Sequence, residues 1–147
     1  GMESAEFLVS TNPGQDAKPM IKVASGGELS RISLAIQVIT AQTSQIPSLV
    51  FDEVDVGIGG GVAKTVGKLM RDLGKTTQIL CVTHQAQVAG QGHNHFFVSK
   101  LSHSDSALSQ IRELADDEKV KEVARMLGGE NLSNESLAHA EQMVATS

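Results

Sequence analysis

The sequence predicts an α/β fold in which a mostly parallel sheet is flanked by helices. Two short, continuously apolar runs at 48–51 and 78–83 are typical of strands that are buried on both faces. The segment between them, 62–73, has apolar residues at helical spacing. Its 147 residues are 40% hydrophobic and 20% charged, which suits one packed domain or one lobe of a larger one.

Composition excludes several classes of site. Twelve Lys and Arg against seventeen Asp and Glu give a net charge of −5, which argues against a nonspecific DNA-binding surface. Four Phe without Trp or Tyr argue against a base-stacking platform. The single cysteine excludes an internal disulfide and a Cys-cluster zinc site. Cys81 stands in an apolar run, and we expect a buried structural thiol.

The N-terminal third predicts a strand, a loop and a long helix. Residues 7–10 have the pattern of a short strand, and 11–24 contain Asn, Gly and Pro that are typical of a loop. Apolar residues recur at helical spacing from Glu28 to Gln42. They occupy two faces, so we expect this helix to be buried on most sides.

The middle of the chain predicts a strand–helix–strand unit. Pro47 precedes the first strand, a glycine-rich loop at 57–61 follows it, and Gly74 fits the C′ position that ends the helix. With short loops the two strands run parallel, joined by a right-handed crossover. Both strands therefore end at the same edge of the sheet, where open α/β sheets bind ligands.

The C-terminal third has a weaker pattern. A strand is predicted at 96–98, a mobile Ser-rich turn at 101–107 and a returning strand at 108–114. Asp116 could cap a helix that ends before Gly128, and Ser133 could cap a last helix to about Val144. We assign residues 1–5 to a terminal segment, 6–130 to one α/β lobe and 131–147 to a C-terminal helix or tail.

The first candidate site is the turn Ser25, Gly26, Gly27 and Glu28 at the start of the long helix. A Ser-x-x-Glu pattern is a common capping box. The two glycines are not explained by capping, since each costs about 1 kcal/mol against Ala inside a helix. Glycine also allows close approach to bare amides, which bind phosphate at helix N-termini. Both interpretations stay open.

The second and third candidate sites follow the two strands. Asp52 and Glu53 end the first strand; one carboxylate could hold Mg²⁺ through its water shell while the other orients an attacking water. His84 follows the neighbouring strand and is expected beside these carboxylates. The spacing of His93 and His95 suggests a metal pair, but no cysteine and few acids accompany them.

Other catalytic motifs are absent from the sequence. Residues 58–65 resemble the phosphate-binding pattern GxxxxGK[ST], but Ile58 and Ala63 replace its glycines. No GxSxG, HExxH or GxGxxG occurs, which argues against a free-standing hydrolase or dehydrogenase.

Taken in order, the candidate sites resemble the C-terminal half of an ABC-type ATPase head, a P-loop NTPase-like fold. Ser25–Glu28 resembles the ABC signature, Leu49–Glu53 a Walker B strand with its glutamate, Val54–Gly57 a D-loop and His84 the switch histidine. The wording of 23–31, 51–60 and 82–89 is most similar to the RecN family, SMC-like ATPases of DNA double-strand break repair. The resemblance runs from about Phe7 to Gly129.

This resemblance implies that two heads enclose two ATP molecules. Asp52 would organise Mg²⁺, Glu53 would act as general base or orient water, and His84 would contact the γ-phosphate. Ser25, Gly26, Gly27 and Glu28 would serve the ATP of the second head, and Asp55 would couple the two sites. The P-loop and coiled coil would belong to the N-terminal half of the head.

The resemblance also implies partners and a compartment. The partners would be that N-terminal half, a second head in a homodimer, and DNA through the complete protein, in the cytoplasm and without a membrane. We expect this chain alone to be inactive, because it contains no P-loop. A non-catalytic interaction module that keeps the head fold, or half of a transporter ATPase, are the alternatives.

Overall fold

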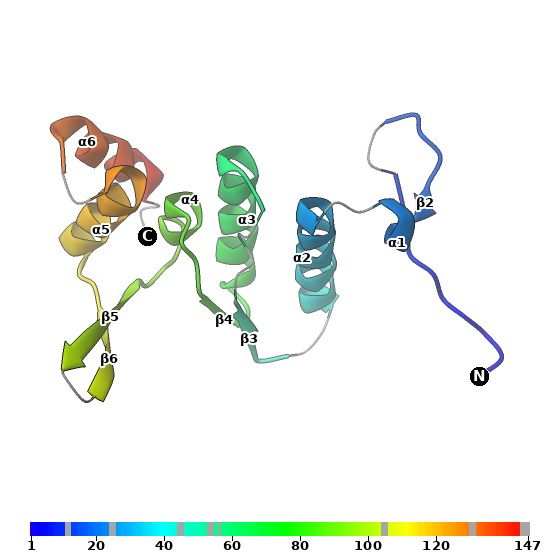
Figure 1. The fold of residues 1–147 in the computed structure, drawn as a ribbon, viewed down its shortest axis with the longest axis horizontal. Helices are drawn as coiled ribbons and strands as arrows, with labels where there is room; N and C mark the ends of the chain where they lie inside the picture. The colour runs from blue at the N-terminus through cyan, green and yellow to red at the C-terminus, as the bar shows by residue number, and fades with distance from the viewer. Residues whose placement is uncertain are drawn as a thin grey trace.

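A computed structural model describes residues 1–10, 13–23, 26–43, 46–52, 55, 57–103, 106–129 and 132–144. The elements succeed one another along the long axis of the molecule, with the N-terminus at one end (Figure 1). In chain order they are β1 (Leu8–Val9), β2 (Lys18–Pro19), α1 (Met20–Val23), α2 (Gly26–Thr43), β3 (Ser48–Phe51), α3 (Gly60–Leu73), β4 (Gln78–Cys81), α4 (Ala86–Ala89), β5 (Phe96–His103), β6 (Ser106–Glu113), α5 (Asp116–Gly128) and α6 (Asn134–Met143).

The predicted βαβ unit is the centre of the fold. β3 and β4 pair in parallel from Ser48 opposite Gln78 to Phe51 opposite Cys81, with α3 between them in sequence. The α/β class and the shared strand ends are thereby confirmed. Among the described strands this is the parallel pair, while β1–β2 and β5–β6 are antiparallel.

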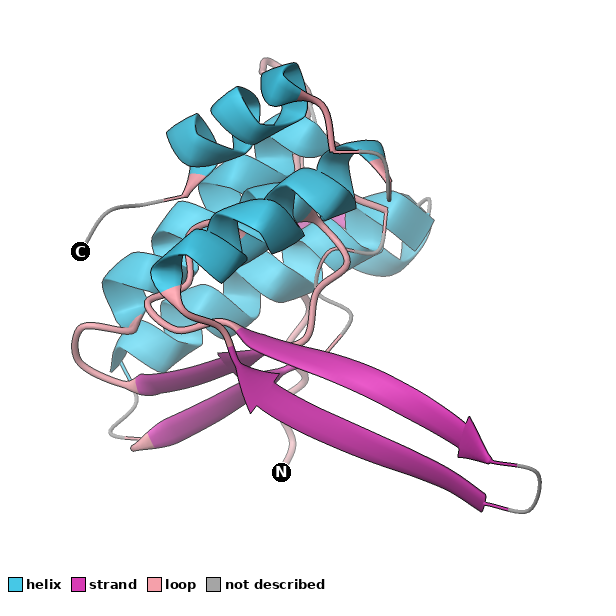
Figure 2. Ribbon diagram, turned by 90° about the vertical axis from the view of Figure 1, so that its left-hand side faces the viewer, coloured by secondary structure: helices cyan, strands magenta, loops and turns pink. Residues whose placement is uncertain are grey.

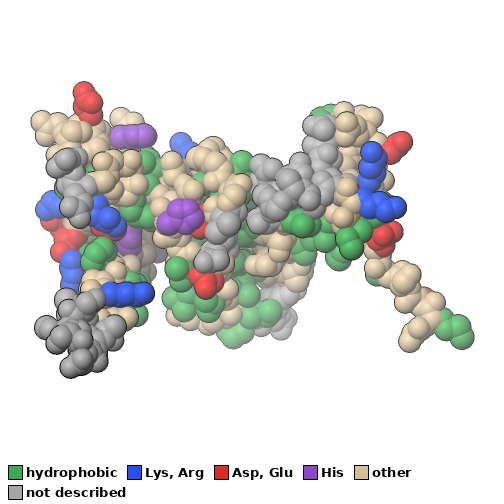
Figure 3. Space-filling view, viewed as in Figure 1, with side chains coloured by type: hydrophobic (Ala, Val, Ile, Leu, Met, Phe, Trp, Pro, Cys, Tyr) green, Lys and Arg blue, Asp and Glu red, His purple; other side chains and the backbone are tan. Residues whose placement is uncertain are grey.

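The prediction that both central strands are buried on both faces is wrong. Val50, Leu80 and Val82 are 69%, 49% and 60% exposed. Successive side chains of a strand point to opposite faces, and the described helices lie on one side of the strands (Figure 2). Hydrophobic side chains accordingly gather on the surface in the region of β3 and β4 (Figure 3).

The two long helices begin earlier than predicted. α2 begins at Gly26 and α3 at Gly60, so each includes glycines that the sequence placed before the helix. α2 is buried on one side, through Leu34, Val38 and Ala41, and not on most sides. A second apolar stripe on this helix is half-buried at Ile32 and Ile36 and exposed at Leu29 and Ile39.

Gly74 ends α3, but not as the left-handed C′ residue that the sequence predicts. It is the C-cap, with φ of −62°, and its N–H donates to the carbonyl of Met70 at 2.8 Å. This right-handed conformation is open to any residue, so positive φ does not explain the glycine here.

The ends of the chain are more regular than predicted. Residues 11–24, expected to be a loop, include β2 and α1. Residues 101–107, expected to be a mobile turn, are largely strand, because the β5–β6 register continues to His103 opposite Ser106. Backbone hydrogen bonds extend this hairpin despite its polar side chains.

The C-terminal helices form as predicted, with one difference in capping. Ala115, not Asp116, is the N-cap of α5, and its N–H donates to Glu118 at 3.0 Å. Ser133 caps α6 by accepting from the N–H of Ser136 at 3.1 Å. α6 packs on α5 and reaches α4, where Gln91 donates to the carbonyl of Met143 at 2.9 Å.

Two hydrophobic clusters meet at α4. Val88 belongs to a cluster that joins α2, β3, α3 and β4, and Ala86 belongs to a cluster that joins α4, α5 and α6. This short helix therefore connects the βαβ unit to the C-terminal helices. None of the helices in the described residues is both long and apolar enough to cross a membrane.

Candidate functional site at the β3 and β4 strand ends

The carboxyl ends of β3 and β4 bring together the polar residues that follow each strand. Asp52 comes directly after Phe51 and is exposed. Residues 83–85 come after β4 and lie against Asp55 from the β3 side. The sequence predicts His84 beside Asp52 and Glu53, whereas the acidic residue that it contacts in the described part of the structure is Asp55.

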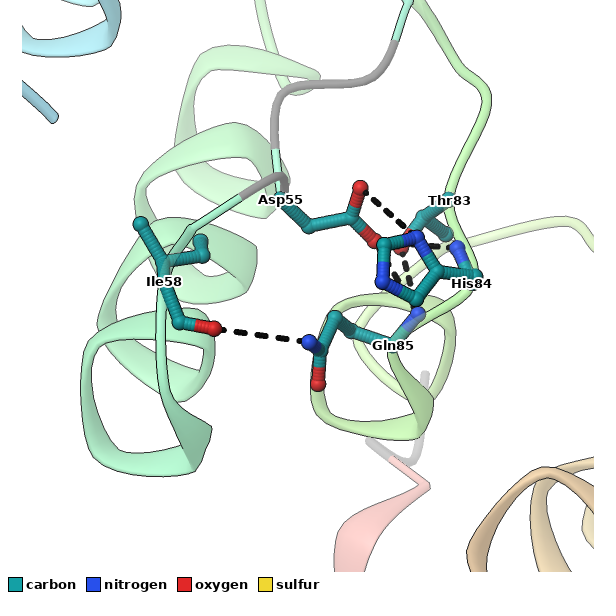
Figure 4. A network of polar contacts seen from close by, with 5 residues as sticks. All are labelled: Asp55, Ile58, Thr83, His84 and Gln85. Atoms are coloured by element: carbon teal, nitrogen blue, oxygen red, sulfur yellow. Dashed lines mark hydrogen bonds and ion pairs between the residues drawn. The ribbon is translucent and has the colours of Figure 1, made fainter. Parts of the chain in front are cut away.

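Asp55 is the buried member of this group. Its residue is 1% exposed, and its Oδ2 accepts hydrogen bonds from the Thr83 hydroxyl and from the N–H groups of His84 and Gln85, the latter two at 2.9 and 3.0 Å (Figure 4). One carboxylate oxygen thus holds the whole turn after β4.

Hydrogen bonding outweighs burial in the titration of Asp55. Burial alone raises the pKa of a carboxyl group, but the bonds from Thr83, His84 and Gln85 favour the charged form. The net effect lowers the pKa of Asp55 below its ordinary value of 3.8. At neutral pH the group is a carboxylate, which only accepts hydrogen bonds.

His84 lies over the same carboxylate but faces solvent. Its Nδ1 is 3.3 Å from Oδ1 of Asp55, and its side chain is 67% exposed (Figure 4). Gln85 extends the network, because its side-chain amide donates to the carbonyl of Ile58 at 3.4 Å. The loop after β3 and the turn after β4 are therefore joined at two points.

Cys81 ends β4 just before this turn. Its pKa is raised to about 11, first by burial and then by the charges of Asp55 and Asp52. The thiol is partly exposed but packs against the central cluster. A protonated thiol is a poor nucleophile, which fits the predicted structural role.

Several predicted site residues are not described by the structure. Ser25 and Glu53 lie outside the described residues, and so does the side chain of Glu28. Gly26 and Gly27 lie in the first turn of α2, although the sequence predicts that this helix begins at Glu28.

The histidine pair at 93 and 95 does not form a metal site in the described part of the chain. There, no group of at least three His, Cys, Asp or Glu residues could hold a metal ion. His95 is half-buried, and its Nδ1 lacks a hydrogen-bond partner. Burial lowers the pKa of His95, against the opposing effect of the Glu122 charge.

Sequence reasoning missed Thr83 and Gln85. Both flank the predicted histidine at the strand end, and a hydroxyl or an amide next to a candidate residue is a signal for a supporting contact. Their partner could not be identified, because Asp55 lies 28 and 30 residues earlier in the chain.

The curated proteins that are similar to this chain share one name, DNA repair protein RecN. Over 144 residues the chain is 54% identical to the DNA repair protein RecN of Vibrio cholerae and 48% identical to that of Haemophilus influenzae. Over 145 residues it is 43% identical to RecN of Deinococcus radiodurans. These alignments cover 98% or 99% of the chain.

This chain belongs to the RecN family. It spans about a quarter of the length of the RecN proteins that it matches, 26% for that of Vibrio cholerae. The RecN resemblance predicted from the sequence is therefore confirmed. No family model matches the chain.

Solved structures place the fold among SMC heads. The chain matches the Smc head domain of Pyrococcus yayanosii with a TM-score of 0.62 and 21% identity, covering 79% of this chain and 24% of that one. It matches an SMC ATPase studied for ATP-driven dimerization and DNA-stimulated activation with a TM-score of 0.61 and 20% identity, covering 82% and 78%. The chain thus shares the fold of these SMC head domains, in agreement with the P-loop NTPase-like fold that the sequence predicts.

Proposed function

We propose that this chain supplies part of the ATP-hydrolysing head of an SMC-like DNA repair protein. The observation that carries the proposal is the convergence of Asp52, Asp55 and His84 at the ends of two parallel strands. The RecN sequence and the SMC head fold support it. DNA would be bound by the full-length protein and not strongly by this chain alone.

Asp52 fits the role of a Mg²⁺ ligand. It is exposed directly beyond the buried Phe51, and a carboxylate oxygen is the donor that this cation prefers. Mg²⁺ usually keeps several waters and binds one or two carboxylates together with substrate phosphates, so a full cage of protein ligands is not needed. The bound ion would neutralise charge on the ATP phosphates.

Glu53 and His84 would lie near the γ-phosphate of the bound ATP. Glu53, next to Asp52 in the chain, would orient the attacking water or accept its proton. His84 is exposed at the same sheet edge and would contact the γ-phosphate. The turn that holds His84 is fixed by Asp55, so the ring would not need to be ordered when ATP binds.

The remaining roles involve a second head. Ser25, Gly26, Gly27 and Glu28, at the start of α2, would meet the ATP bound to the partner head, and Asp55 would couple the two sites. The N-terminal half of the head would contribute the P-loop and the coiled coil.

The decisive experiment is Glu53→Gln in a full-length RecN protein that carries this sequence. The amide keeps the shape of the side chain but removes the base, so ATP binding should persist while hydrolysis falls by about 10²–10⁴. The heads should then stay closed on ATP. Glu141→Gln, an exposed position on α6, is the matched control. Turnover within about tenfold of wild type would exclude this role for Glu53.

A further inference from the structure

The two oxygens of Asp55 have different surroundings. Oδ2 accepts from the Thr83 hydroxyl and from the N–H groups of His84 and Gln85, which uses its capacity as an acceptor. Oδ1 is buried without a hydrogen-bond partner among the described residues, and Nδ1 of His84 lies 3.3 Å from it. A buried carboxylate oxygen without a donor is costly, and a hydrogen on that ring nitrogen would supply the donor.

The ring of His84 bridges this buried oxygen and solvent. Its side chain is 67% exposed, whereas that of Asp55 is fully buried. Figure 4 shows the ring lying over the carboxylate, between Thr83 and Gln85. In the described residues, no hydrogen bond engages the second ring nitrogen, Nε2. The arrangement resembles a metal-ligating or general-base histidine whose inner nitrogen is fixed by a carboxylate.

We infer that Asp55 is the positioning residue of His84, fixing the hydrogen on Nδ1 and presenting Nε2 to the ligand at the sheet edge. This inference rests on the proposed function for the identity of that ligand. Oδ2 fixes the position of the turn through its three hydrogen bonds. Oδ1 holds the Nδ1 side of the ring inward, so that Nε2 faces outward as a hydrogen-bond acceptor. Asp55 thereby links the loop after β3 to the histidine after β4.

Asp55→Asn separates this role from simple support of the turn. The amide oxygen can replace Oδ2 and keep the bonds to Thr83, His84 and Gln85. The amide NH₂ then takes the place of Oδ1 and donates toward Nδ1, which favours a hydrogen on Nε2 instead. The turn survives while the histidine tautomer changes. Thr83→Val is the matched control, because it removes a bond to Oδ2 and leaves Oδ1 unchanged.

The direct measurement is the tautomer of His84, read from its ring nitrogen shifts by NMR in this chain. We expect a hydrogen on Nδ1 in wild type and in Thr83→Val, and a shift toward Nε2–H in Asp55→Asn. A wild-type ring with its hydrogen on Nε2 would overturn the inference without any variant. An unchanged ring signal in folded Asp55→Asn would overturn it as well.

A second measurement uses the full-length protein. Asp55→Asn should lower kcat for ATP by at least about tenfold with little change in KM, and should lose most of this effect when His84 is already Ala. Equal losses in both backgrounds would overturn positioning through His84. If the protein proves not to hydrolyse ATP, the proposed function fails, but the tautomer measurement still decides the inference.

Discussion

At the residue scale, Asp55 shows how burial and hydrogen bonding compete. Burial alone would raise the pKa of a carboxyl group, because a buried environment disfavours the charged form. The turn after β4 reverses this by donating to Oδ2 from a hydroxyl and two backbone N–H groups. The charge therefore stabilises the turn, provided that the group stays ionised.

This balance predicts an acid-dependent loss of stability. The folded-state pKa of Asp55 is below the ordinary value of 3.8, so its contribution is complete above that value and is lost as the pH falls through the folded-state pKa. Asp55→Asn should be less stable than wild type at pH 7, and the gap should narrow below about pH 4. Urea unfolding at several pH values measures this.

Asp16→Asn serves as the control for that series. Asp16 is exposed, and its substitution should change the free energy of unfolding by less than about 0.5 kcal/mol. A gap between wild type and Asp55→Asn that is equal at pH 7 and pH 3.5 would contradict the assignment.

At the element scale, α3 packs on α4 through a glycine. A Cβ added to Gly67 would lie 3.0 Å from the carbonyl oxygen of Gln87 and 2.9 Å from Cγ of Gln91. The distance to Cγ of Gln91 is shorter than real Cβ contacts, and the distance to the backbone carbonyl of Gln87 is tighter than most of them. The close approach holds α4 in place, and α4 carries the link between the two hydrophobic clusters.

Gly67→Ala should therefore destabilise the chain by about 1–3 kcal/mol, although Ala is the better helix former. Gly61→Ala, in the same helix, is the matched control, since nothing lies within 4 Å of its added Cβ. It should be neutral or stabilising by up to about 1 kcal/mol. Thermal melts of the two variants test the packing, and equal stabilities would contradict it.

A glycine-to-alanine substitution at the start of α2, Gly27→Ala, tests function as well as packing. If the turn at 25–28 only caps the helix, Gly27→Ala should be harmless or stabilising by up to about 1 kcal/mol. If the turn meets a phosphate across a dimer, the methyl group blocks the approach. We expect the second result: in the full-length protein, folding survives and ATP-driven head closure fails.

Mixed dimers sharpen this prediction. A Gly27→Ala head paired with a Glu53→Gln head forms one composite site with both defects and one with neither. We expect some ATP hydrolysis to return in the mixture. Full activity of Gly27→Ala homodimers, or a loss of activity that matches a loss of folded protein, would exclude the phosphate site.

At the scale of the whole molecule, the chain exposes more surface than a compact domain. Its accessible surface is 10338 Å², whereas a compact protein of 15.5 kDa exposes about 7,200 Å². The bare face of β3 and β4 contributes to the excess through Val50, Leu80 and Val82. Because parallel strands are normally covered on both faces, we expect the rest of a full-length RecN protein to cover this one.

Val50→Thr tests that covering. In this chain Val50 is 69% exposed, so the substitution should change the free energy of unfolding by less than about 0.5 kcal/mol. In the full-length protein the hydroxyl would be buried, at a cost of about 1–3 kcal/mol. Val66→Thr should destabilise both, since Val66 is already buried. A neutral Val50→Thr in both settings would show that the face stays exposed.

The sequence by itself determined the order and type of the central elements. The apolar runs at 48–51 and 78–83, and the helical spacing between them, predicted β3, α3 and β4 because side-chain burial sets these periods. The same pattern implied parallel pairing, and thus a common edge for Asp52 and His84. The RecN resemblance followed from the motifs after these strands together with the one at the start of α2.

Only the tertiary structure decided which contacts those residues make. Nothing local in the sequence joins Asp55 to Thr83, His84 and Gln85, since the pairing depends on how two strand ends are placed side by side. The exposure of Val50 and Leu80 was likewise not predictable from their hydrophobicity. Apolar residues in both strands predict burial on both faces, and only the three-dimensional packing shows that this chain leaves one face of β3 and β4 exposed.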